Sequence, residues 1–355
     1  MKSILQDLNF IEIEKLVLEY GEKKYRAKQL FEGLMQGKKL SEIPVSASLR
    51  NALLEEFEDE PVKIKETFVS KEDGTKKFLF ALSDGNLIEG VFMRYQYGNT
   101  QCVSTQVGCR MGCKFCASTL GGLVRNLTAG EILSQILVVN RLEGGTLKDR
   151  AVTNVVLMGS GEPFDNYDDV VRFLKNASSE GGICISPRNV SLSTCGLVPE
   201  MKRFAAEGLP VNLTVSLHAS SDEERRRTMP IANKYQIAQI MDACADYFKK
   251  TGRRYIFEYT LIAGENCDKE HAEALSALVK GKPCHVNLIR LNEVKERSLT
   301  AADEKAAYRF LGVLQKNGIS ATLRRSLGSD IGGACGQLRA KFLDSQNFLQ
   351  GKKFS

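Results

Sequence analysis

Three cysteines stand close together in the chain, in the segment Cys109-Arg-Met-Gly-Cys113-Lys-Phe-Cys116. Thiolates are soft ligands, so this C-x3-C-x2-C spacing suits zinc or an iron–sulfur cluster. A structural zinc site takes four protein ligands, and the sequence offers no second CxxC or His pair to complete one. A four-iron cluster held by three thiolates leaves one iron open. That iron can chelate the amino and carboxylate groups of S-adenosylmethionine (SAM) and pass an electron to its sulfonium. The spacing therefore favours an open [4Fe-4S] cluster over zinc and over buried core cysteines.

Two further cysteines are candidates for chemistry. Cys335 lies in Asp330-Ile-Gly-Gly-Ala-Cys-Gly, and its glycine neighbours indicate a flexible, exposed loop. The alternative is a buried cysteine that packs as a small apolar residue. Cys102 precedes the first cluster cysteine by seven residues. The alternative to a chemical role is that Cys102 is an inward-facing strand residue.

Composition gives broad limits. With 355 residues, 43% hydrophobic and 26% charged, the chain is typical of a soluble globular protein. The net charge of +6 is too small to prove a polyanionic partner. The basic clusters suit phosphate contact or, equally, a solvated charged face. They are Lys23, Lys24, Arg26 and Lys28; Arg225 to Arg227; and Arg324 with Arg325.

The sequence predicts a cytoplasmic protein that does not enter membranes. The start, MKSILQDLNFIEIEK, carries acidic residues where a signal peptide needs an apolar stretch. No apolar run approaches the roughly 18 residues of a membrane span. The ten cysteines are therefore expected to be reduced thiols.

Two kinds of structure are expected before residue 100. Residues 1–58 show apolar residues at near-helical spacing and predict a helical domain. Residues 59–100 predict a β-hairpin extension, with strands at 77–82 and 87–95 around the turn Ser83-Asp-Gly-Asn86.

Strands and helices alternate through the catalytic domain that we expect at residues 101–345, followed by a tail at 346–355. Helices are expected at 128–142, with Thr128 as N-cap and Glu131 three residues on, and at 237–250. Such alternation predicts an α/β fold with parallel strands, either an open doubly wound sheet or a partial (β/α)6 barrel. The expected strands are Gln101–Val107, Thr153–Met158, Asn189–Thr194, Val211–Leu217, Tyr255–Ile262 and His285–Leu291.

Polar or glycine-rich residues follow nearly every expected strand. In parallel α/β folds the active site gathers at the C-terminal ends of the strands. The cysteine loop follows the first strand, and Gly159-Ser-Gly161-Glu162-Pro163 follows the second. The Glu162 carboxylate could accept hydrogen bonds from the SAM amino group. The later strand ends carry Ser193, Ser216, Leu217, His218 and Asn292.

The chain resembles the radical SAM superfamily in its C-x3-C-x2-C loop, in Phe115 before the third cysteine and in Gly-Glu-Pro. It resembles more specifically the RlmN/Cfr family of RNA methyltransferases, over about residues 20–342. The motifs are Cys-Val-Ser-Thr-Gln-Val-Gly-Cys (102–109), Gly-Ser-Gly-Glu-Pro-Phe-Asp-Asn-Tyr-Asp (159–168), Ser-Leu-His-Ala (216–219), His-Val-Asn-Leu-Ile (285–289) and Ala-Cys-Gly-Gln-Leu (334–338).

The resemblance implies roles for residues at matching positions. Cys109, Cys113 and Cys116 would hold the [4Fe-4S] cluster. Cys335 would carry the methyl group, Cys102 would be its transient disulfide partner, and Glu89 would accept a proton. From the residue pattern alone, Glu89 is expected to be a surface strand carboxylate, His218 could be a satisfied core histidine, and Ser193 could cap a strand end. SAM contacts are implied for Gly161, Glu162, Ser193, Ser216, Leu217, His218 and Asn292.

The resemblance also implies a reaction and partners. The RlmN branch methylates C2 of an adenosine in the peptidyl-transferase loop of 23S rRNA and C2 of the adenosine 3′ of the tRNA anticodon. Two SAM molecules serve each turnover: one methylates Cys335, and cleavage of the other makes the S-methyl group reactive toward the ring. Expected partners are tRNA, 23S rRNA before or during ribosome assembly, and an electron donor such as flavodoxin or ferredoxin.

Three alternatives stay open at this point. A Cfr-like enzyme would methylate C8 of adenine in 23S rRNA and confer antibiotic resistance. A radical SAM enzyme acting on protein, such as a glycyl-radical activase, would need neither Cys102 nor Cys335. An RNA-binding protein with structural zinc would hold no iron.

Overall fold

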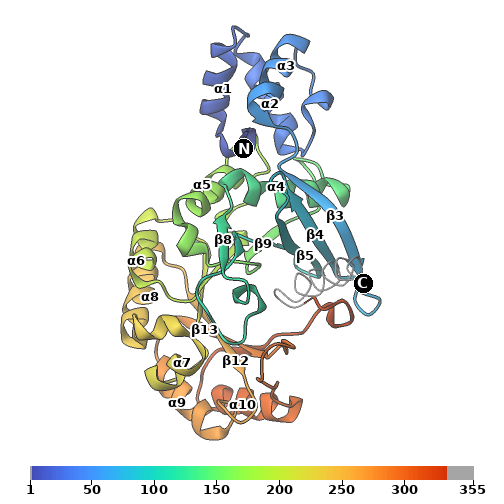
Figure 1. The fold of residues 1–355 in the computed structure, drawn as a ribbon. Helices are drawn as coiled ribbons and strands as arrows, with labels where there is room; N and C mark the ends of the chain where they lie inside the picture. The colour runs from blue at the N-terminus through green and yellow to red at the C-terminus, as the bar shows by residue number, and fades with distance from the viewer. Residues whose placement is uncertain (1, 334–355) are drawn as a thin grey trace. The chain divides into compact units, whose positions relative to one another are not determined.

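The computed structural model describes residues 2–333, and the chain divides into two compact units (Figure 1). Unit 1 comprises Met1–Val107, Arg125–Ser160 and Asn166–Val190, and unit 2 comprises Gly108–Val124, Gly161–Asp165 and Ser191–Ser355. Cys335 and the expected tail lie outside the described residues.

Unit 1 begins with the expected helices, α1, α2 and α3. Asn9 and Glu12 form a capping box at the start of α1, and the Ser46 side chain caps α3. The sequence did not indicate the short parallel pair formed by β1 and β2, which joins the two ends of this helical segment. The bounds are β1 Ser3–Ile4, α1 Phe10–Glu19, α2 Tyr25–Met35, α3 Ala47–Glu56 and β2 Phe57–Glu58.

An antiparallel meander follows the helices, with β3 (Val62–Val69), β4 (Lys76–Leu82), β5 (Leu87–Tyr95) and β6 (Gly98–Cys102) side by side (Figure 1). The predicted hairpin is confirmed as β4 and β5, because Asp84, Gly85 and Asn86 supply the polar turn. Phe78 and Phe80 are fully buried on β4 and anchor this sheet to the core.

The remaining elements of unit 1 begin the α/β part. β9 (Asn154–Leu157) lies parallel to β6, and the helices are α4 (Ala129–Leu142) and α5 (Tyr167–Ala177). Thr128 caps α4 in a box with Glu131, as predicted. The short strands β7 (Gln106–Gly108) and β8 (Leu123–Asn126) flank the cysteine loop.

The prediction of one strand over residues 101–107 is wrong. The Ser104 backbone N–H bonds to the Gln135 side chain, and the Ser104 hydroxyl donates to the Glu89 carbonyl. These side-chain bonds replace the ladder, so β6 ends at Cys102 and β7 begins at Gln106.

Unit 2 contains parallel strands in the order β10, β11, β12, β13, β14, connected by helices. Helices α6 and α8 end at Gly208 and Gly252, both at positive φ, where glycine terminates a helix without strain. Strand β14 was not predicted. The bounds are β10 Val190–Thr194, α6 Val198–Glu207, β11 Asn212–Ser216, α7 Asp222–Thr228, α8 Ile237–Thr251, β12 Tyr255–Leu261, α9 Lys269–Val279, β13 Cys284–Arg290, α10 Glu304–Lys316 and β14 Ala321–Leu323.

Packing in unit 2 positions the strand ends. α6 packs on α8 and α9 packs on α10 (Figure 1), while every residue of β12 except Ile256 is buried. A strand buried on both faces is typical of the centre of a parallel sheet. No helix among residues 2–333 is long and apolar enough to cross a membrane.

Candidate active site

The cysteine loop is held by backbone hydrogen bonds within unit 2. Cys109 N–H donates to the Gly122 carbonyl at 2.9 Å, and Lys114 N–H donates to the Thr228 carbonyl at 2.9 Å. The Thr119 hydroxyl bridges the carbonyls of Cys113 and Cys116, at 3.2 and 2.9 Å. Because its own backbone is tied down, the loop presents the thiols from a defined frame.

The thiols lie in apolar surroundings. Cys113 is buried in a cluster with Cys195 and Met229, against which Phe115 and Cys116 also pack. Burial, with the neighbouring thiols and the Glu162 carboxylate, raises the pKa of Cys109 to about 12 and the pKa of Cys113 above the usual range. Burial thus favours the neutral form of Cys109 and Cys113 until a metal ion binds.

The donor set fits an iron–sulfur cluster by its chemistry. Thiolates on a short loop within apolar walls are the ligands that such clusters take, and a bound metal deprotonates them. Among residues 2–333, no three His, Cys, Asp or Glu side chains are grouped closely enough to hold a metal ion as they stand.

Glu162 lies in the loop that follows β9, on residues Gly161–Asp165 of unit 2. It is buried, and its Oε2 accepts from Cys195 N–H at 2.7 Å while its Oε1 accepts from Phe164 N–H at 3.1 Å. Burial raises the pKa of Glu162, and these hydrogen bonds oppose the rise. A carboxylate has about four lone-pair positions, so it can still accept from an amino group. Gly161 has φ +114°, which suits glycine and leaves room at the backbone.

One ion pair joins this loop to the cysteine loop. Arg110 Nη2 lies 2.5 Å from Asp165 Oδ1, and both residues belong to unit 2. Asp165 follows Glu162 by three residues, so this ion pair holds the cysteine loop beside Glu162, the carboxylate predicted to bind the SAM amino group.

His218 connects the end of β11 to the cysteine loop. Its ring makes an edge contact with Phe115, with the centroids 4.7 Å apart. Its Nδ1 accepts from Thr260 N–H at 3.0 Å, so in the neutral ring Nε2 carries the proton. Burial, reinforced by the Arg225 charge, lowers the pKa of His218 to about 3. The residue has φ +58°, an uncommon conformation for a non-glycine residue that occurs often at functional sites.

The other predicted SAM contacts occupy neighbouring strand ends in unit 2. Ser193 on β10 is opposite Thr214, and Ser216 ends β11 opposite Glu258. Both serines are partly exposed, Leu217 is buried, and Asn292 is exposed just beyond β13. The structure thus places the predicted residues at the C-terminal ends of β10, β11 and β13 in one sheet.

Arg225 was expected in a basic cluster suited to phosphate contact, and that expectation is wrong. Its side chain is fully buried and donates to the carbonyls of Cys195 at 2.6 Å, Ser216 at 3.1 Å and Leu217 at 3.2 Å. It therefore holds the ends of β10 and β11 in position. No local signal distinguishes it from Arg226 and Arg227, because its partners lie eight to thirty residues away.

Replacing Arg225 with Met is expected to lower the free energy of unfolding by at least about 3 kcal/mol, because buried carbonyls lose their donor. The matched control is Arg226→Met on the exposed face of α7, which should change it by less than about 0.5 kcal/mol. Urea denaturation followed by circular dichroism measures both. Equal values for the two variants would contradict a positioning role.

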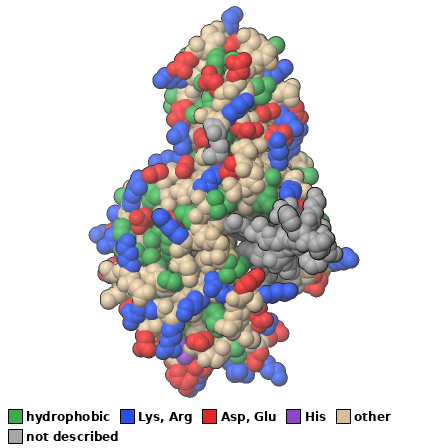
Figure 2. Space-filling model, viewed as in Figure 1, with side chains coloured by type: hydrophobic (Ala, Val, Ile, Leu, Met, Phe, Trp, Pro, Cys, Tyr) green, Lys and Arg blue, Asp and Glu red, His purple; other side chains and the backbone are tan. Residues whose placement is uncertain are grey.

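The other basic clusters are partly neutralised. Lys24 Nζ lies 2.9 Å from Glu14, and Lys28 Nζ lies 3.8 Å from Glu32. Figure 2 shows lysine and arginine mixed with acidic side chains over the N-terminal helices. Within the described residues the Lys23 side chain is exposed and makes no ion pair or hydrogen bond, so it remains available for phosphate contact.

Glu89 and Cys102 come together in unit 1. Val91 on β5 is directly opposite Cys102 on β6, and Glu89 lies two residues from Val91. The period-two alternation of a strand places Glu89 and Cys102 on the same face of the sheet. The expectation of a surface carboxylate is wrong, because Glu89 is 6% exposed.

Lys77 completes this group, and sequence reasoning missed it. Lys77 is on β4, directly opposite Val91 of β5. It is 1% exposed, and its Nζ lies 3.9 Å from Glu89 Oε2. A buried carboxylate needs such a cation to stay charged. The only sequence signal was a lysine within an otherwise apolar strand, Lys77-Phe-Leu-Phe.

The chain resembles known radical SAM proteins. Residues 103–276 match the Radical SAM superfamily. The chain is 50% identical over 344 residues to the probable dual-specificity RNA methyltransferase RlmN of Alkaliphilus metalliredigens, with 96% of each chain covered. It is 49% identical over 349 residues to the protein of the same name from Clostridium perfringens strain 13, with 98% of this chain and 99% of that protein covered.

A solved structure shows the same fold. It is a radical SAM methyltransferase from Sphaerobacter thermophilus, with a TM-score of 0.89 and 39% sequence identity, covering 94% of this chain and 98% of that one. The predicted radical SAM fold is thereby confirmed.

Proposed function

This chain belongs to the RlmN/Cfr family of radical SAM RNA methyltransferases, and we propose that it methylates C2 of adenosine in RNA. The proposed substrates are the peptidyl-transferase loop of 23S rRNA and the adenosine 3′ of the tRNA anticodon. The observation that carries the proposal is the buried group of Glu89, Lys77 and Cys102. Only a radical SAM reaction that needs a proton acceptor and a resolving thiol would use such a group.

The proposed cofactors are a [4Fe-4S] cluster and SAM, two molecules of which serve each turnover. When bound, they supply an electron, a methyl group and a hydrogen-abstracting radical. Cys109, Cys113 and Cys116 hold the cluster. Glu162 binds the SAM amino group. Ser193, Ser216 and His218 border the proposed SAM site from the adjacent ends of β10 and β11. Gly161, Leu217 and Asn292 complete the proposed contacts.

The remaining roles belong to the chain's own nucleophiles and base. Cys335, which lies outside the described residues, carries the methyl group as a thioether. After the methylene carbon bonds to C2, the unpaired electron of the adduct would pass to the bound redox cofactor, and Glu89 accepts the ring proton. The Cys102 thiolate then attacks the Cys335 sulfur. The bond between that sulfur and the methylene carbon breaks with its electron pair on carbon, the carbon takes up a proton to become the methyl group, a disulfide forms, and methylated RNA leaves. An electron donor such as flavodoxin or ferredoxin serves the cluster.

Nucleoside mass spectrometry of RNA from a deletion strain tests the proposal. Loss of 2-methyladenosine from 23S rRNA and tRNA, with recovery when the gene is restored, is the expected result. Loss of 8-methyladenosine would assign the chain to the Cfr-like alternative. Unchanged nucleosides, together with no methyl transfer to either RNA by the purified holoenzyme, would refute RNA methylation.

Lys77→Met is expected to shift the pH dependence of turnover. Removing the buried ammonium group takes a favourable charge away from the Glu89 carboxylate, so its protonated form, which cannot accept a proton, persists to higher pH. The acid limb of the kcat profile should therefore move to higher pH. Single-turnover methylation of tRNA between pH 6 and 9 measures the shift.

Lys76→Met is the matched control. Lys76 is the neighbouring residue on β4 and pairs instead with Glu143, which keeps Arg94 as a second partner. Its acid limb should stay at the wild-type position. A Lys77→Met profile that is lowered at every pH without a shift would show that Lys77 serves stability alone.

A further inference from the structure

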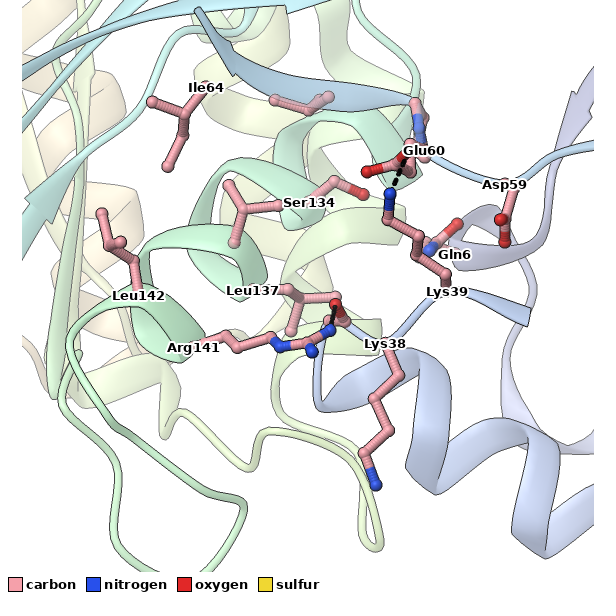
Figure 3. Close-up of a pocket in the computed structure, with 14 residues that line it drawn as sticks. Gln6, Lys38, Lys39, Asp59, Glu60, Ile64, Ser134, Leu137, Arg141 and Leu142 are labelled. Atoms are coloured by element: carbon pink, nitrogen blue, oxygen red, sulfur yellow. Dashed lines mark hydrogen bonds and ion pairs between the residues drawn. The ribbon is translucent and has the colours of Figure 1, made fainter. Parts of the chain in front are cut away.

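Unit 1 contains a cavity of about 470 Å³ that includes none of the predicted site residues. It is lined by Gln6 in the turn Leu5–Asp7, by the loop after α2, by the start of β3 and by one face of α4 (Figure 3). This volume lies in the range of about 300–1,000 Å³ that is usual for small-ligand sites.

Two buried polar side chains that line this cavity lack partners. Gln6 is 4% exposed and Ser134 is 3% exposed, and within the described residues neither Gln6 Oε1 nor Ser134 Oγ has a hydrogen-bond partner. Buried polar atoms are normally satisfied, and an unsatisfied one costs stability.

Ser134 on α4 differs from Ser276, a buried serine on α9. Ser276 donates to the carbonyl of Ala272, four residues earlier, at 2.8 Å. Ser134 makes no such bond within the described residues, and its side chain belongs to the face of α4 that lines the cavity (Figure 3). A mid-helix serine usually bonds the carbonyl four residues back or points to solvent, and Ser134 does neither, so a polar group brought into the cavity could satisfy it.

The charges at the cavity leave one cation available. Lys39 is 2.8 Å from Glu60, and Arg141 binds Glu42 and the Gly37 carbonyl. Among residues 2–333, the Lys38 side chain has neither an ion pair nor a hydrogen bond. Its ammonium group can therefore neutralise one negative group of a ligand.

The rest of the wall is apolar apart from Asp59, whose Oδ1 accepts from Leu40 N–H at 2.7 Å. Ile64, Leu137 and Leu142 face the cavity (Figure 3). Such surfaces suit the face of a flat ring, while Gln6 Oε1 can accept only from an N–H or O–H donor on its edge. The ligand therefore combines a flat, donor-bearing ring with an anionic group.

We propose that this cavity, which we call the Gln6–Ser134 pocket, binds one unpaired nucleotide of the RNA substrate. The base lies against Leu137 and Ile64, its amino or imino edge donates to Gln6, and its phosphate pairs with Lys38. Proteins that read RNA commonly accept bases splayed out of single-stranded regions in this way. The inference rests on the proposed function, because it assumes that the substrate is RNA.

Binding of a tRNA anticodon stem-loop at increasing salt tests the phosphate contact. Lys38→Ala should weaken binding about three- to tenfold at low salt and reduce the slope of log Kd against log salt by about 0.7 to 1. The matched control is Lys148→Ala, an exposed lysine beyond α4 in the same unit, which should bind like wild type. Equal salt slopes for wild type and Lys38→Ala would overturn this contact.

Filling the cavity tests the base contact. Ser134→Leu should raise the KM for RNA about tenfold or more with kcat unchanged, because the pocket lies outside the chemistry. Ser134→Ala should weaken binding less and melt at or above the wild-type temperature, since it removes an unsatisfied group. Ser134→Ala still tests the base contact if Ser134→Leu does not fold. A wild-type KM in a folded Ser134→Leu protein would overturn the proposal.

Titration with adenosine and cytidine 5′-monophosphate, against inorganic phosphate, separates this proposal from the proposed function. NMR shifts or thermal stabilisation in wild type that disappear in Ser134→Leu support the pocket even if no RNA is methylated. Methylation of RNA by a wild-type protein whose mononucleotide response is unchanged by Ser134→Leu refutes the pocket and leaves the function standing.

Discussion

Cys113→Ala protein, purified without oxygen, is expected to contain no iron–sulfur cluster and to transfer no methyl group. Three thiolates are the smallest set that anchors a four-iron cluster while leaving an iron open, and Cys113 is the candidate that lies buried within the apolar cluster. Iron and sulfide assays and the visible absorbance of the reconstituted protein measure the cluster directly.

Cys195→Ala is the control for this experiment. Cys195 belongs to the same apolar cluster and is similarly buried, at 6% exposed against 8% for Cys113. The two substitutions remove the same atom from the same packing environment, so their packing costs should be similar, while only Cys113→Ala should lose iron. Normal iron content in Cys113→Ala would remove that residue from the ligand set.

Features set by neighbouring residues could be predicted from the sequence. Thr128 and Glu131 lie three residues apart and form the predicted capping box at α4. The turn around Gly85 forms the predicted hairpin, and the parallel strands β10 to β13 match short apolar runs that were expected there. These elements depend on local side-chain chemistry and periodicity, which a single sequence displays.

Features set by distant partners could not be predicted. Ser104 ends β6 early because Gln135, thirty-one residues away, takes its backbone N–H. Arg225 resembles a surface residue until the fold brings three carbonyls around its guanidinium. Glu89 is buried because Lys77 from the neighbouring strand pairs with it. Burial of a charged side chain is decided by such partners, so it becomes visible only in the fold.

The same sheet motivates the second large effect. Cys102→Ala protein is expected to accumulate a covalent adduct with its RNA substrate, whereas Cys335→Ala protein should form none. Cys102 is a buried cysteine on the same face of the sheet as Glu89. If Cys335 carries the methyl group, its removal stops the reaction before RNA is touched. If Cys102 resolves the intermediate, its removal leaves Cys335 joined to adenine through a methylene bridge.

A denaturing gel should show RNA-bearing Cys102→Ala protein, and nuclease digestion followed by mass spectrometry should locate the modification on Cys335. Cys244→Ala is the matched control, because Cys244 is also a buried cysteine but lies on α8, in unit 2. It should turn over without a crosslink. Normal turnover by Cys102→Ala would make Cys102 a packing residue. Another thiol would then have to attack the Cys335 sulfur, because proton removal without thiol resolution cannot release the methylated base from Cys335.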